Sequence, residues 1–79
     1  MDVKINLNTV EKVKRFVSII TAVPCNCDII SESRRYIIDA KSIMGIFSLD
    51  LSKDLTLKIY CENITMVNNI KDRIADFIV

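Results

Sequence analysis

The sequence contains no histidine and no tryptophan. Without histidine there is no Ser-His or Cys-His pair, which excludes the usual arrangements for nucleophilic catalysis. The chain also shows no phosphate-binding loop and no convincing pair of carboxylates for acid and base work. Because no catalytic set emerges, the sequence favours a protein that is not an enzyme.

Cysteine is also scarce, with three residues in 79. An odd and small number argues against a disulfide framework and fits a reducing compartment. Cys25 and Cys27 with the distant Cys61 supply three thiolates without a histidine, which leaves the common zinc ligand sets incomplete. We therefore expect structural thiols, no metal and no cofactor.

Neither sign of charge predominates, since eleven basic and ten acidic side chains leave a formal net charge of +1. This balance gives no general attraction to nucleic acid or to anionic lipid. The apolar stretches are far too short to span a membrane, and no basic segment followed by a hydrophobic run opens the chain. We therefore expect a soluble, non-exported protein of the cytoplasm. A 51% apolar content suffices for one domain over residues 1–79, near the lower size limit for independent folding.

Apolar spacing predicts seven elements in the order β-α-β-β-α-β-α. Alternation predicts strands over residues 2–7, 27–32, 36–39 and 55–59. Helical spacing predicts helices over residues 9–22, 42–49 and from 65 onward. Asn8 and Glu11 have the spacing of a capping box, and Ser42 can cap the second helix. Ser33–Arg35 forms a polar turn, and its paired arginines favour a turn looser than a two-residue hairpin.

This order indicates an α+β fold with a four-stranded antiparallel sheet and three helices on one face, an open-faced β-sandwich. The run Ala40–Leu49 (AKSIMGIFSL) resembles the regulatory-serine segment of HPr, the phosphocarrier protein of the bacterial sugar phosphotransferase system. The resemblance extends in register from residue 26 to residue 63 and implies the same sandwich. In that fold the fourth strand lies between the first and second, which would make Cys27 and Cys61 neighbours.

The resemblance assigns Ser42 to the regulatory serine, which a bifunctional kinase/phosphorylase modifies. Unpaired backbone N–H groups at a helix start favour an anion there. The alternative is that Ser42 is only an N-cap, worth about 1 kcal/mol.

Apolar residues follow this serine on one short helical face, where the family presents hydrophobic side chains to partner proteins. They are Ile43, Met44 and Phe47. The alternative is that they fill the core, as we expect for Ile46 and Leu49.

The match fails where the family carries its phospho-histidine, near the start of the first helix. Glu11 is the residue of this chain that falls at that position. A carboxylate would have to form an acyl phosphate and would repel the incoming anion, so it is a poor replacement. Lys12, Lys14 and Arg15 follow, and they form either a basic spot for an acidic partner or the solvated face of an amphipathic helix.

The resemblance thus implies an HPr-like regulatory binding protein that cannot carry out histidine phosphotransfer. It is similar in this respect to the catabolite-repression HPr homologue, which assists a LacI-type repressor after its serine is phosphorylated. The expected partners are an HPr kinase/phosphorylase, a LacI-type repressor or phosphotransferase-system enzymes. Two alternatives stay open, a decoy that binds relay enzymes without carrying phosphate and a small αβ sensing or oligomerisation module unrelated to sugar transport.

Overall fold

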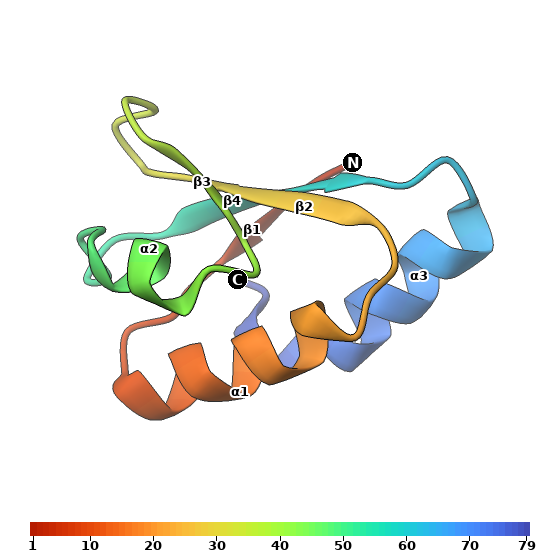
Figure 1. Cartoon of the computed structure of the whole chain (residues 1–79), viewed down its shortest axis with the longest axis horizontal. Helices are drawn as coiled ribbons and strands as arrows, with labels where there is room; N and C mark the ends of the chain where they lie inside the picture. Colours follow the sequence, from red (N-terminus) through yellow and green to blue (C-terminus); the bar gives the residue numbers. More distant parts are fainter.

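The computed structural model describes residues 1–79 and contains one four-stranded antiparallel sheet with its helices on one face (Figure 1). The elements are β1 (Asp2–Ile5), α1 (Val10–Thr21), β2 (Asn26–Ile30), β3 (Ile37–Asp39), α2 (Ile43–Phe47), β4 (Leu55–Tyr60), α3 (Ile64–Arg73) and a final 3₁₀ turn (Ala75–Phe77). The predicted α+β order β-α-β-β-α-β-α is confirmed. The strand order is β1-β4-β2-β3, so β4 lies between β1 and β2 as predicted.

Alternation along the strands gives the sheet one buried face and one open face. The helix side is lined by buried apolar residues, namely Val3, Ile5, Cys27, Ile29, Leu55, Leu57 and Ile59. The open side carries mainly polar and charged residues, and there Asp28 pairs across the strands with both Lys58 and Asp39. This separation explains why period-two alternation predicted the strands correctly.

The helices close the core against the sheet. Phe16 of α1 and Phe77 of the 3₁₀ turn meet edge to face, with ring centroids 5.8 Å apart and an interplanar angle of 88°. Val67 and Ile70 of α3 are buried as well. None of the helices has the length and apolar character needed to cross a bilayer.

The cap of α1 differs from the predicted one. The Thr9 Oγ1 accepts a hydrogen bond of 3.1 Å from the Lys12 N–H, and Thr9 has the extended backbone that an N-cap requires. The predicted capping box of Asn8 and Glu11 is therefore wrong. Asn8 instead turns its amide oxygen to the Lys12 Nζ, at 3.1 Å, and donates its own N–H to the Asn6 Oδ1.

The connection between β2 and β3 is the looser turn that the paired arginines favoured. It runs from Ser31 to Tyr36, whose backbone groups meet in a 3.0 Å hydrogen bond from the Ser31 N–H to the Tyr36 carbonyl. Arg34 has a φ of 62°, a left-handed conformation that is uncommon outside glycine and asparagine. The resulting loop projects beyond the sheet at the upper left of Figure 1.

Two predictions about the cysteines are wrong, namely that the chain has no disulfide and that Cys61 is the neighbour of Cys27. A disulfide joins Cys25 and Cys61, whose Cα atoms lie 5.5 Å apart, whereas Cys27 is free and buried. Strand register explains the difference. Because Asn26 pairs with Tyr60 and Cys27 with Ile59, the next position along the ladder sets Cys25 opposite Cys61.

Candidate functional site

Ser42 is the N-cap of α2, as predicted. Its Oγ accepts a hydrogen bond of 3.2 Å from the Gly45 N–H, and its own N–H donates to the Asp39 carbonyl at 3.0 Å. The side chain is exposed. A capping hydroxyl is therefore held in one geometry at the surface.

Gly45 keeps the space around this hydroxyl open. It is the only glycine of the chain, and a Cβ at this position would lie 3.1 Å from the Ser42 Oγ and 3.4 Å from the Ile38 Cδ1. A side chain here would crowd both the cap and the contact of α2 with β3. Glycine thus permits the close approach of this short helix to the sheet.

Two of the three predicted docking side chains are exposed. Met44 is 77% exposed and Phe47 is 38% exposed, while Ile43 is half-buried against the core. Ile46 and Leu49 are buried, as expected. The exposed set of Ser42, Met44 and Phe47 is called the α2 surface below.

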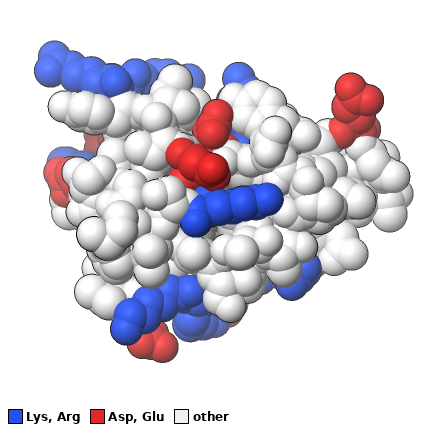
Figure 2. Space-filling view, in the orientation of Figure 1, with Lys and Arg blue, Asp and Glu red and all other residues white.

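The α2 surface lies in a weakly charged region of the molecule. Figure 2 shows basic side chains over the β2–β3 loop and along α1, with a largely uncharged area around α2 between them. α1 and α2 also pack against each other, so the basic side chains of α1 lie on a neighbouring element. Figure 2 also shows acidic side chains at the border of this area, so its surroundings carry both signs of charge and favour neither sign in a partner.

The three predicted basic residues of α1 have different surroundings. Arg15 forms an ion pair with Asp76 at 3.0 Å and lies over the Phe77 ring, 5.5 Å from its centroid. Lys12 and Lys14 form no ion pair. The charge available to a partner therefore comes mainly from these two lysines.

Glu11 lies in the first turn of α1 and is exposed. Its carboxylate makes no hydrogen bond, but a negative charge at this end of a helix is favourable. Because the chain has no histidine, no imidazole lies beside Glu11.

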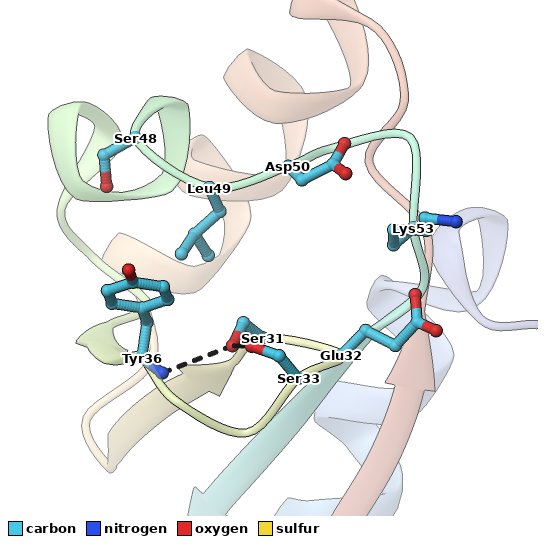
Figure 3. Close-up of a pocket in the computed structure, with 8 residues that line it drawn as sticks. All are labelled: Ser31, Glu32, Ser33, Tyr36, Ser48, Leu49, Asp50 and Lys53. Carbon is cyan, nitrogen blue, oxygen red and sulfur yellow. Dashed lines mark hydrogen bonds between the residues drawn. The ribbon is translucent and has the colours of Figure 1, made fainter.

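A hollow of about 390 Å³ lies between the β2–β3 loop and the segment that follows α2 (Figure 3). Its lining residues are Ser31, Glu32, Ser33, Tyr36, Ser48, Leu49, Asp50 and Lys53. Figure 3 shows the Tyr36 ring beside Leu49 and Ser48, next to the end of α2. No sequence pattern predicted this hollow, although a tyrosine beside paired arginines in a turn is a signal that could have pointed to it.

Most hydrogen-bonding groups of the hollow already have partners within the chain. The Ser31 Oγ lies 3.1 Å from the Ser33 Oγ and accepts the Tyr36 N–H at 3.3 Å, and the Ser48 Oγ donates to the Gly45 carbonyl. Hydrogen bonds from Ser52 lower the pKa of the Asp50 carboxyl. The Tyr36 ring, 61% exposed, is the main apolar surface left for contact, and the Glu32 and Lys53 side chains beside it form no ion pair within the chain. The hollow therefore suits an apolar or aromatic side chain of a protein with a charged group next to it.

No group of three or more metal-ligating side chains comes together anywhere in the structure. The Cys25 and Cys61 sulfurs instead lie 3.4 and 3.3 Å from the Met66 Sδ, at the start of α3. This sulfur cluster joins the ends of β2 and β4 to α3.

Comparison with solved structures identifies the architecture. The crystal structure of HPr-C-His from Thermoanaerobacter tengcongensis matches this chain with a TM-score of 0.72 and 20% sequence identity, over 96% of this chain and 92% of that one. The chain therefore has an HPr-like fold. No protein-family model matches the sequence, and none of the curated proteins compared with it matches either.

Proposed function

We propose that this chain is an HPr-like regulatory binding protein of the phosphotransferase system that works without histidine phosphotransfer and is controlled by phosphorylation of Ser42. The observation that carries the proposal is an exposed capping serine with Met44 and Phe47 exposed in the helix that it begins. The HPr-like fold and the complete absence of histidine support it. The proposed setting is the cytoplasm, where sugar phosphorylation is regulated.

Phosphorylation would change the chemistry of the α2 surface without rebuilding the fold. A phosphoryl group adds a charge of roughly −1.5 to −2 and three acceptor oxygens. The Gly45 N–H can donate to one of these oxygens as it now donates to the Ser42 Oγ. An apolar surface would thus gain an anion at its edge, which favours a partner that presents arginine or lysine beside an apolar pocket.

The proposed partners of the α2 surface are an HPr kinase/phosphorylase and a LacI-type repressor, in a role in carbon catabolite repression. Met44 is flexible and polarisable, which suits a surface that meets more than one protein. The hollow beside Tyr36 adjoins the end of α2 and offers a second contact to a protein bound at the α2 surface.

A titration tests the proposal. Purified repressor is titrated with the unmodified and the Ser42-phosphorylated protein, each as wild type and as Met44→Ala. Because Met44 is 77% exposed, its removal should leave the free energy of unfolding within about 0.5 kcal/mol of wild type. We expect the phosphorylated form to bind more tightly and Met44→Ala to weaken binding about tenfold, or 1.4 kcal/mol.

Ile64→Ala is the matched control, because Ile64 is 61% exposed and begins α3, at the end of the molecule opposite α2 (Figure 1). This variant should bind like wild type. Equal losses for Met44→Ala and Ile64→Ala, or equal affinities of the two phosphorylation states, would contradict the proposal.

A decoy that engages relay enzymes is the second candidate, and the unpaired charges of Lys12 and Lys14 favour it. It predicts that the protein competes with a genuine HPr for the general relay enzyme and that Lys14→Glu removes the competition. In either case phosphoenolpyruvate and the relay enzyme should leave no stable phosphate on Glu11. Label on the wild type that is lost in Glu11→Gln would overturn that expectation.

A further inference from the structure

One edge of the sheet is covered by another segment of the chain, and the other edge is not. At the β1 edge, the Val79 N–H donates to the Lys4 carbonyl, the Asn6 N–H donates to the Phe77 carbonyl, and Ile5 forms an isolated bridge with Ile78. The C-terminal segment therefore covers that edge. β3 is the other edge, and no segment of the chain pairs with its outer side.

The pattern of hydrogen bonds between β2 and β3 shows which backbone groups of β3 point outward. The ladder with β2 uses a bond from the Ser31 N–H to the Tyr36 carbonyl at one end and a bond from the Ala40 N–H to the Cys27 carbonyl at the other. In an antiparallel pair the intervening residues alternate between the inner and outer side. The backbone groups of Ile37 and Asp39 therefore point away from β2, and the Asp39 carbonyl among them already accepts the Ser42 N–H. Arg35 lies two residues before Ile37 in the β2–β3 loop, where its N–H donates to the Ser33 Oγ at 3.4 Å.

The outward-facing residues of one β3 strand are complementary to the same residues of a second copy. Ile37 is 65% exposed and lies midway between Arg35 and Asp39, two residues away on either side. If a second copy of β3 pairs antiparallel with the first about a two-fold axis at Ile37, each Arg35 stands opposite the Asp39 of the other copy. The two Ile37 side chains then meet between the two ion pairs, on the open face of the sheet.

Within one chain, both charges lack an oppositely charged partner. The single ion pair of the structure joins Arg15 to Asp76, so neither Arg35 nor Asp39 takes part in one. Asp39 lies directly opposite Asp28 in the register of β2 and β3, and like charges opposite each other on a sheet are destabilising. An arginine from a second copy would relieve that repulsion.

We propose that the β3 edge is a self-association surface, through which two copies of this chain form a symmetric dimer with a continuous eight-stranded sheet. The contact uses the outward backbone groups of Ile37, its exposed side chain and two Arg35–Asp39 ion pairs. Natural edge strands avoid such pairing by being very short or through charges, proline or a covering segment. β3 has only three residues, which limits the contact, but its central residue is an exposed isoleucine that no proline or covering segment protects. The short contact implies a weak dimer, with a Kd between roughly 10 μM and 1 mM. The inference does not depend on the role proposed for Ser42.

Sedimentation of the full chain over a range of concentrations tests the surface. We expect the apparent mass of wild type to rise with concentration and to reach about 1.5 to 1.9 times the monomer mass at about 1 mM protein, as this range of Kd requires. Ile37→Lys should remain monomeric because two lysines would then face each other. Ile64→Lys, which alters an equally exposed isoleucine on α3, should dimerise like wild type.

Charge exchange then tests the register. Arg35→Asp and Asp39→Arg should each be monomeric alone, because each would place like charges opposite each other twice. Mixed in equal amounts they should form a heterodimer, since both pairs are then of opposite charge. Thermal unfolding of each variant verifies that it is folded, which matters for Asp39→Arg because the Asp39 Oδ1 accepts the Lys41 N–H at 2.9 Å.

A wild type that stays monomeric at every concentration would overturn the inference. So would a dimer that Ile37→Lys leaves intact, because that dimer would use another surface. A mixture of folded charge variants that stays monomeric would also overturn it.

Discussion

The Ser42 Oγ accepts the Gly45 N–H at 3.2 Å, and a Cβ at residue 45 would lie 3.1 Å from the same oxygen. One hydroxyl therefore both caps α2 and forms the proposed phosphorylation site. The lack of a side chain at Gly45 leaves room for this oxygen and for the groups that would replace it. The stability of α2 and the proposed regulation consequently depend on the same atom.

Removal of the cap should destabilise the protein measurably. We expect Ser42→Ala to lower the free energy of unfolding by about 1 kcal/mol, because the Gly45 N–H loses its acceptor. Ser48→Ala is the control. It removes the hydrogen bond from the Ser48 Oγ to the Gly45 carbonyl, but this carbonyl still accepts the backbone N–H of residue 48 at 3.1 Å. Urea unfolding compares the two variants, and equal losses would argue against Ser42 as the principal cap of α2.

Phe47 should behave as a partly exposed ring. Because it is 38% exposed, Phe47→Ala should cost clearly less than the roughly 3 to 5 kcal/mol expected for a buried phenylalanine. Phe77→Ala provides the buried reference, since Phe77 is 2% exposed. Thermal unfolding and repressor affinity should be measured on the same samples. A loss for Phe47→Ala as large as that for Phe77→Ala would remove Phe47 from the α2 surface.

Purification without reductant should yield the Cys25–Cys61 disulfide and a free Cys27 thiol. The disulfide closes a segment with a sequence separation of 36, for which the chain-entropy model gives roughly 3 to 4 kcal/mol of stabilisation. Reduction should therefore lower the urea midpoint of wild type and of Cys27→Ala, but leave Cys61→Ala unchanged. In a reducing cytoplasm we expect both residues as thiols. Peptide mass spectrometry that finds Cys27 bonded to Cys61 would contradict the strand register.

Stability should decline in alkaline solution partly through Cys27. Burial raises the pKa of this thiol above its ordinary value of 9.0, with Lys41 opposing and Asp28 and Asp39 adding to the shift. The native state therefore retains the proton at pH values where the unfolded state has lost it, so the free energy of unfolding falls as pH rises through this window. We expect a shallower decline above about pH 8.5 for Cys27→Ala than for wild type. Identical slopes would show that the thiol is not the titrating group.

Local sequence patterns predicted the helices and strands, whereas the cap of α1 depends on contacts that form only in the folded chain. The alternation of Leu55, Leu57 and Ile59 predicted β4 because one face of that strand is buried. Asn8 and Thr9 are both good capping residues, and only the backbone of the folded loop selects Thr9.

The cysteine pairing and the Tyr36 hollow lay beyond such patterns. Two residues of register separate Cys25 from Cys27, and that offset depends on how β2 and β4 align across the sheet. The hollow joins residues 31–36 to residues 48–53, which no local spacing relates. The resemblance predicted Ser42 and its neighbours because that whole site lies within one short segment.

The central claim is that Ser42 is a regulatory phosphorylation site, and intact-protein mass spectrometry after incubation with HPr kinase/phosphorylase and ATP tests it most directly. We expect one phosphoryl group on wild type and on Ser48→Ala, and none on Ser42→Ala, with peptide fragmentation assigning the group to Ser42. No modification under conditions that fully phosphorylate a genuine HPr, or a phosphoryl group on another residue of the folded wild type, would contradict the account.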